Sequence, residues 1–186
     1  MMAAVSQRRC YLLLSCLPVM GCDNLSEFRG AFKGRIVSGS FVRSCFEDEI
    51  EANLVFDPSQ AAGPVEDVPE TGRNRITIKS DTQVVFDETL LEPIGLLSND
   101  TLADFDFPGQ KRLRNFMLVA RPESGPLAGR DALIVVSLLA TKRVELRVIA
   151  RTDGTDESCP PQAAEDGGVP ESGIREYYGL FSMKQQ

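Results

Sequence analysis

The stretch Arg143-Val-Glu-Leu-Arg-Val-Ile-Ala-Arg151 alternates between apolar and mostly charged side chains along its whole length. Successive side chains of a β-strand point to opposite faces, so a period of two is typical of a strand with one dry face and one wet face. The apolar set is predicted to face a core, and it consists of Val144, Leu146, Val148 and Ala150. The set expected to face solvent includes Arg143, Glu145, Arg147 and Arg151.

Similar patterns recur along much of the chain. Residues 28–36 place Phe28, Phe32 and Ile36 on one face together with Gly30 and Gly34. Glycine on the dry face of a strand implies a bend or the close approach of another backbone. Further strands are predicted at residues 41–46, 52–56, 74–79, 83–86, 101–107, 112–121, 132–140 and 174–184.

Two of these segments carry extra information. Residues 132–140 are a continuous apolar run, consistent with a strand buried on both faces. Residues 87–99 are the least β-like part; they allow a helical turn or two, which Pro93 and Gly95 limit.

These patterns predict one all-β domain over residues 28–186, with about eight to ten strands. Hairpins with few helices indicate either an antiparallel β-sandwich or a closed, lipocalin-like β-barrel. The long loops and the run at 132–140 favour the sandwich. The glycines in the first and last strands favour the barrel, because they would let the two ends of a sheet meet.

The N-terminal residues have three zones. Residues 1–9 carry Arg8 and Arg9 and no acid, residues 10–20 are almost wholly apolar, and Gly21 precedes Cys22. A basic region, a short apolar region and a small-residue junction are typical of a secretory signal. The apolar run is shorter than the roughly 20 residues that a membrane-spanning helix needs.

The stretch Leu17-Pro-Val-Met-Gly-Cys22 resembles the lipobox of bacterial lipoproteins. The resemblance implies that residues 1–21 are removed, that Cys22 carries lipid, and that residues 22–27 form a lipidated tether. It implies export and attachment to a bacterial membrane, facing the periplasm or the cell surface. The inner and the outer membrane both stay open. An ordinary cleaved signal is the alternative interpretation.

The composition excludes several classes of function. The chain has 20 basic and 27 acidic residues, so removal of Arg8 and Arg9 with the signal leaves 18 against 27, a net charge of −9. Such an acidic chain argues against nucleic-acid binding, and the short basic stretch 111–114 is interpreted as a solvated strand face. The absence of histidine removes the commonest general base and the commonest transition-metal ligand. We therefore expect no enzyme activity, no cofactor and no metal site.

Acidic residues supply the remaining catalytic or metal candidates. Asp104 and Asp106 share a predicted strand face, and Glu47, Asp48 and Glu49 form a run. Paired carboxylates hydrolyse glycosides, but these residue types are common on wet surfaces. Residues 153–157 offer oxygen ligands for calcium, but their spacing does not match an EF-hand loop.

Cysteine use fits export. Cys10 and Cys16 lie in the signal and Cys22 is the lipid site, which leaves Cys45 and Cys159. Two remaining cysteines in an oxidising compartment predict one disulfide between them. Two separate thiols are the alternative.

The aromatic residues separate two functional hypotheses. They fill a solid core if the domain binds another protein or the cell envelope, and they line a cavity if it carries a small apolar ligand. The tyrosine pair is expected to send one ring to each face of the last strand. The aromatic set is Phe28, Phe32, Phe56, Phe105, Phe107, Tyr177, Tyr178 and Phe181.

Overall fold

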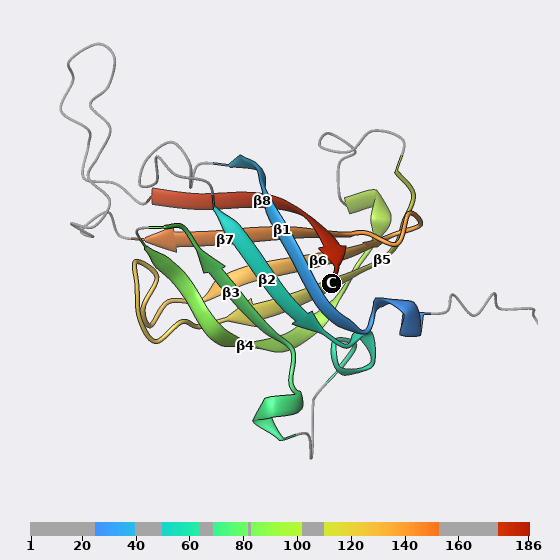
Figure 1. Ribbon diagram of the computed structural model, residues 1–186, viewed down its shortest axis with the longest axis horizontal. Helices are drawn as coiled ribbons and strands as arrows, with labels where there is room; N and C mark the ends of the chain where they lie inside the picture. The colour runs from blue at the N-terminus through green and yellow to red at the C-terminus, as the bar shows by residue number, and fades with distance from the viewer. Residues whose placement is uncertain (1–24, 40–49, 64–68, 82, 102–109, 153–174) are drawn as a thin grey trace, which may run out of the picture.

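The computed structural model describes residues 25–39, 50–63, 69–81, 83–101, 110–152 and 175–186 (Figure 1). Eight antiparallel strands form one sheet that closes into a barrel in the order β1 to β8. Their bounds are Gly30–Gly39 (β1), Glu51–Phe56 (β2), Arg75–Lys79 (β3), Val84–Leu97 (β4), Arg112–Ala120 (β5), Ala132–Leu139 (β6), Val144–Thr152 (β7) and Arg175–Gln185 (β8). The described residues contain no α-helix, only the 3-10 turns Leu25–Phe28 (η1), Pro58–Gln60 (η2), Glu70–Gly72 (η3) and Asn99–Thr101 (η4).

The all-β prediction is confirmed, and the barrel is the correct alternative rather than the favoured sandwich. The sheet does not split in two because β1 pairs directly with β8. Gly34 makes this seam possible, since a Cβ at that position would lie 2.8 Å from the carbonyl carbon of Ser182 and 2.9 Å from the Cα of Met183. The close backbone approach that the glycine pattern predicted is therefore the closure of the barrel.

The interior is one continuous apolar cluster. Every strand contributes to it, and the predicted inward sets of β2 and β7 are buried as expected. The rings of Phe56 and Phe116 meet edge to face with centroids 5.5 Å apart. An eight-stranded barrel has an interior just wide enough for side chains to fill. The largest fully buried side chains include Phe32, Phe56, Phe86, Phe116 and Phe181.

Residues 87–97 form the longer part of β4, so the expected helical turn does not occur. The first half of β4, residues 84–90, pairs with β3, and the second half, residues 91–97, pairs with β5. The register shifts between Pro93 and Gly95, so the proline lies beside an irregularity of the ladder, which is where prolines within sheets are found. In Figure 1 the strand sweeps along the lower side of the barrel from one end to the other.

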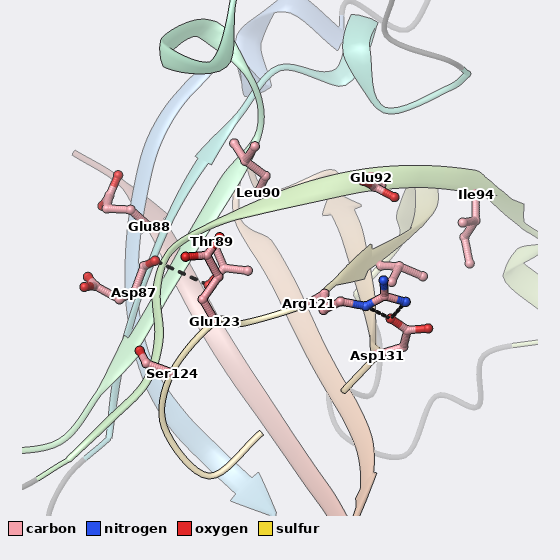
Figure 2. Close-up of a pocket in the computed structure, with 11 residues that line it drawn as sticks. Asp87, Glu88, Thr89, Leu90, Glu92, Ile94, Arg121, Glu123, Ser124 and Asp131 are labelled. Atoms are coloured by element: carbon pink, nitrogen blue, oxygen red, sulfur yellow. Dashed lines mark hydrogen bonds and ion pairs between the residues drawn. The ribbon is translucent and has the colours of Figure 1, made fainter. Parts of the chain in front are cut away.

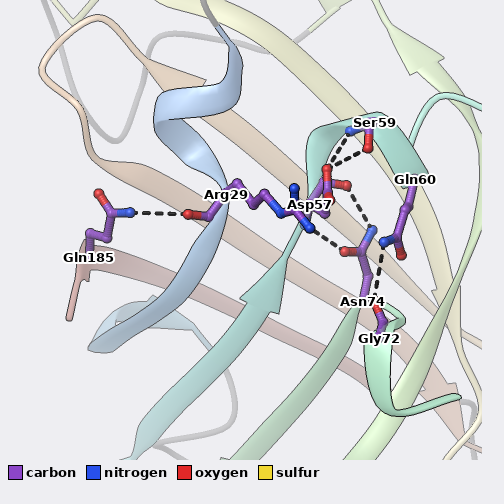
Figure 3. Close-up of polar contacts among 7 residues, drawn as sticks. All are labelled: Arg29, Asp57, Ser59, Gln60, Gly72, Asn74 and Gln185. Carbon is purple, nitrogen blue, oxygen red and sulfur yellow. Dashed lines mark hydrogen bonds and ion pairs between the residues drawn. The ribbon is translucent and has the colours of Figure 1, made fainter. Parts of the chain in front are cut away.

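Polar side chains hold the end of the barrel where η1 begins (Figure 3). Arg29 Nε lies 3.1 Å from Asp57 Oδ2, and the backbone N–H of Asp57 donates to Asn74 Oδ1 at 2.6 Å. Gln185 Nε2 donates to the backbone carbonyl of Arg29 at 3.2 Å. These bonds tie the beginning of β1 to the ends of β2 and β8 and to the start of β3. Leu25 in η1 packs partly buried against the core, and Phe28 is fully inside.

Candidate functional site

A groove of about 720 Å³ lies on the outside of the barrel, between β4 and the loop from β5 to β6 (Figure 2). One wall is the middle of β4, residues 87–94, and the other is the end of β5 with residues 121–131. Leu90, Ile94 and Val119 supply apolar surface, and five carboxylates surround it. The acidic set is Asp87, Glu88, Glu92, Glu123 and Asp131.

The groove exists because β4 changes partner. Pairing with β5 begins at Leu91, opposite Ala120, so residues 84–90 separate from β5 while they stay paired with β3. The loop after β5 fills only part of this gap. Leu127 of the loop is fully buried in the core, and Gly125, in a left-handed conformation, lies close to the carbonyl oxygen of Val84.

Glu88, one of the residues that line the groove, has an unusual backbone with φ +43. Its N–H donates to Thr77 Oγ1 at 3.1 Å, and Thr77 Oγ1 donates to its carboxylate at 2.9 Å. Arg75 Nε lies 2.6 Å from the other carboxylate oxygen. A non-glycine residue in this region costs on the order of 1–3 kcal/mol and persists where its surroundings hold it, often beside a binding site.

The ion pairs of the groove leave it acidic. Arg121 binds Asp131 at 2.7 Å, and both side chains are mostly exposed. Glu88 is bound to Arg75 of β3. Among the residues that the structure describes, Asp87, Glu92 and Glu123 have no ion pair, so these three carboxylates set the local field.

The outer face of β5–β8 differs. Asn115, Ser137, Glu145 and Ser182 form a row of polar residues across β5–β8, and their strand positions face outward. Glu145 is nevertheless fully buried, accepts from Arg112 Nη2 at 3.4 Å and is also bound by Arg147. The expectation that Glu145, Arg147 and Arg112 are solvated is therefore wrong, because these side chains are buried and their charges are paired with one another instead of hydrated.

The other sequence candidates divide into two groups. Phe28, Phe32, Phe56 and Phe181 lie in the core, and Tyr178 is partly exposed on the outer face, so these aromatic residues form no described cavity. The side chain of Tyr177 lies outside the described part of the structure. The remaining candidates lie outside the described residues: Cys22, Cys45, Glu47, Asp48, Glu49, Asp104, Phe105, Asp106, Phe107, residues 153–157 and Cys159.

Sequence reasoning did not find the groove. Pro93 and Gly95 within a poorly alternating segment are a signal for a bent strand, and acids gather at 87, 88 and 92. The second wall is the loop after β5. This loop lies beside β4 only because of the register in which β4 pairs with β5. In the described residues, no group of three or more potential metal-binding side chains gathers, and no helix is long and apolar enough to cross a membrane.

Comparisons with known proteins give no relative for this chain: no family model, no curated protein and no solved structure matches it.

Proposed function

We propose that this protein is a lipid-anchored component of a bacterial envelope, whose non-catalytic β-barrel binds another protein at the membrane surface. The observation that carries the binding role is that the groove lies outside the barrel and not within it. The described interior is packed with phenylalanine and aliphatic side chains, whereas the groove of about 720 Å³ lies on the outer surface. A carrier of small apolar ligands needs the reverse arrangement.

The anchor and the barrel fit together geometrically. A lipid on Cys22 would be separated from Leu25, the first residue of η1, by residues 22–24 only. Such a short segment spans at most about 10 Å, so the η1 end of the barrel would lie against the membrane. Lys111, Lys142 and Lys184 are exposed near this end, where β5, β7 and β8 begin or end. Lysine side chains near a membrane surface favour contact with anionic lipids.

The groove lies toward the other end of the barrel. Its walls include Val119 and the loop before Ala132, where β5 ends and β6 begins. A tethered barrel with its η1 end at the membrane would therefore present the groove toward the surrounding compartment, which suits a binding role.

The test of the anchor is labelling of intact bacterial cells with radioactive palmitate, with Cys22→Ala as the variant and Cys16→Ala as the matched control. We expect the label and membrane retention to be lost with Cys22→Ala and kept with Cys16→Ala. A Cys22→Ala chain that stays labelled and membrane-bound would contradict the anchor.

The test of the binding role is extraction of the purified protein with organic solvent, followed by mass spectrometry. We expect no apolar compound in an amount equal to the protein. An equimolar lipid or other apolar molecule would replace the proposed role with the carrier alternative.

A further inference from the structure

We infer that the groove beside β4 binds an extended, basic peptide segment, which adds to the free edge of residues 84–90 as another strand. This inference rests on the proposed binding role and names the chemistry of the partner. Three features carry it: a strand edge without a partner, walls that are already in place, and an acidic lining over apolar surface.

The first feature is the edge itself. Residues 84–90 pair with β3 on one side, and pairing of β4 with β5 starts only at Leu91. In the described part of the chain, no strand pairs with the other edge of residues 84–90. The loop after β5 lies against the backbone of Val84 and Val85 at Gly125, but it does not replace a strand, since the backbone bonds of its described residues are internal. They run from Ala128 to Gly125, from Gly129 to Pro122 and from Arg130 to Leu127. An unpaired strand edge is a template for an added strand.

The second feature is that the groove is already formed. Gly125 sits over the Val84 carbonyl, where a Cβ would come within 2.5 Å of its oxygen, and buried Leu127 fixes the loop to the core. Glu88 is held by Thr77 and Arg75 on the far side of β4. A preformed site loses little conformational freedom on binding, so a short peptide suffices.

The third feature selects the partner. Asp87, Glu92 and Glu123 line the groove without an ion pair among the described residues. Opposite charges that face each other across paired strands are favourable, so lysine or arginine side chains on the added strand are preferred. Leu90, Ile94 and Val119 give apolar surface to the alternate side chains. A second copy of this chain would be repelled, since its net charge is −7 over the full sequence and −9 without residues 1–21.

The experiment is an NMR titration of the full chain in a nonionic detergent with a blocked heptapeptide of alternating lysine and valine. We expect saturable binding, with the largest shifts and the greatest gain in amide protection at residues 84–90. Two further peptides carry N-methyl groups on alternate backbone nitrogens. One is methylated at the odd-numbered positions and the other at the even-numbered positions, so that each blocks one edge of the added strand. Methylation in the register that faces β4 should abolish binding, and methylation in the other register should be tolerated.

The matched protein variants test the charge. The variant with Asp87→Asn, Glu92→Gln and Glu123→Gln should bind the unmodified peptide about tenfold more weakly at low salt. The control Glu27→Gln removes an exposed acid of η1, at the other end of the barrel, and should change binding by less than about twofold. Retained thermal stability shows that the triple variant is folded.

Absence of binding would overturn the inference, and so would binding that survives both methylated registers, because a cation would then be attracted without forming a strand. These outcomes can be distinguished from failure of the lipid anchor. A chain that takes up palmitate but does not bind the peptide would contradict only the role of the groove. A chain that binds the peptide but takes up no palmitate would contradict only the lipid anchor.

Discussion

The outer surface of β5–β8 and the outer surface of β4 differ in how the barrel wall is covered. Over β5–β8, each strand is paired on both edges and the outward Glu145 is buried between Arg112 and Arg147. Along the first half of β4, no strand of the described residues pairs with the edge that faces the groove, and the nearby acids are exposed. The contrast supports the proposal that a partner binds at the second region and not at the first.

The largest expected effect compares two ion pairs, one from each region. Glu145→Gln keeps the side-chain shape but removes the carboxylate that two buried guanidinium groups share, and we expect a loss of about 3–5 kcal/mol in the free energy of unfolding. Asp131→Asn removes the exposed partner of Arg121 at the groove and should cost less than about 1 kcal/mol. Urea unfolding of both variants measures the difference. Equal losses in the free energy of unfolding would contradict the view that the ion pair of Glu145 is buried and that of Asp131 is exposed.

The second prediction concerns the seam that closes the barrel. Gly34→Val places side-chain atoms against the backbone of Ser182 and Met183, which cannot move without opening the β1–β8 pairing. We expect a loss of about 1–3 kcal/mol, as for an overpacked core. Gly63→Ala is the matched control, because nothing lies within 4 Å of the position that its Cβ would take, and it should change stability by less than about 0.5 kcal/mol. Thermal unfolding that ranks the two variants in the opposite order would contradict the seam.

The strands whose alternation is strong were predictable. Burial of one side of a sheet imposes a period of two, so the alternating side chains identify the buried face from the sequence alone. This holds for residues 143–151, 52–56 and 28–36. The segment around Pro93 was not predictable as strand, since its apolar residues fit a helical turn equally well and only its pairing with β5 decides. The glycines of the first and last predicted strands allowed a barrel, but the choice of barrel over sandwich depends on the pairing of β1 with β8, which lie far apart in the sequence and whose pairing the alternation does not decide. Burial of Glu145 likewise depends on what covers the sheet.

A smaller effect concerns a carboxylate outside the groove. Lys33 Nζ binds Glu51 at 2.8 Å, and this bond, with the charges of Lys33, Arg35 and Lys79, lowers the pKa of Glu51 although partial desolvation opposes it. A lowered pKa in the folded state stabilises the fold above the unfolded-state pKa of about 4.3, and this contribution is lost as the pH falls through the folded-state value.

We therefore expect wild type to exceed Glu51→Gln in stability at neutral pH by a small margin, and this margin should vanish in acid. Unfolding curves recorded between neutral and strongly acidic pH measure it. A margin that grows as the pH falls would show that the sign is wrong.

Hydrogen exchange of backbone amides tests most directly whether β4 has a free edge. β6, residues 132–139, is paired on both sides, whereas residues 84–90 of β4 pair with β3 and with no other strand among the described residues. We predict that the amides within 84–90 that point away from β3 exchange at least about tenfold faster than the amides of β6, because the described residues offer them no backbone acceptor. Equal protection along the two strands would contradict the account, since residues 84–90 would then already have a partner on the groove side.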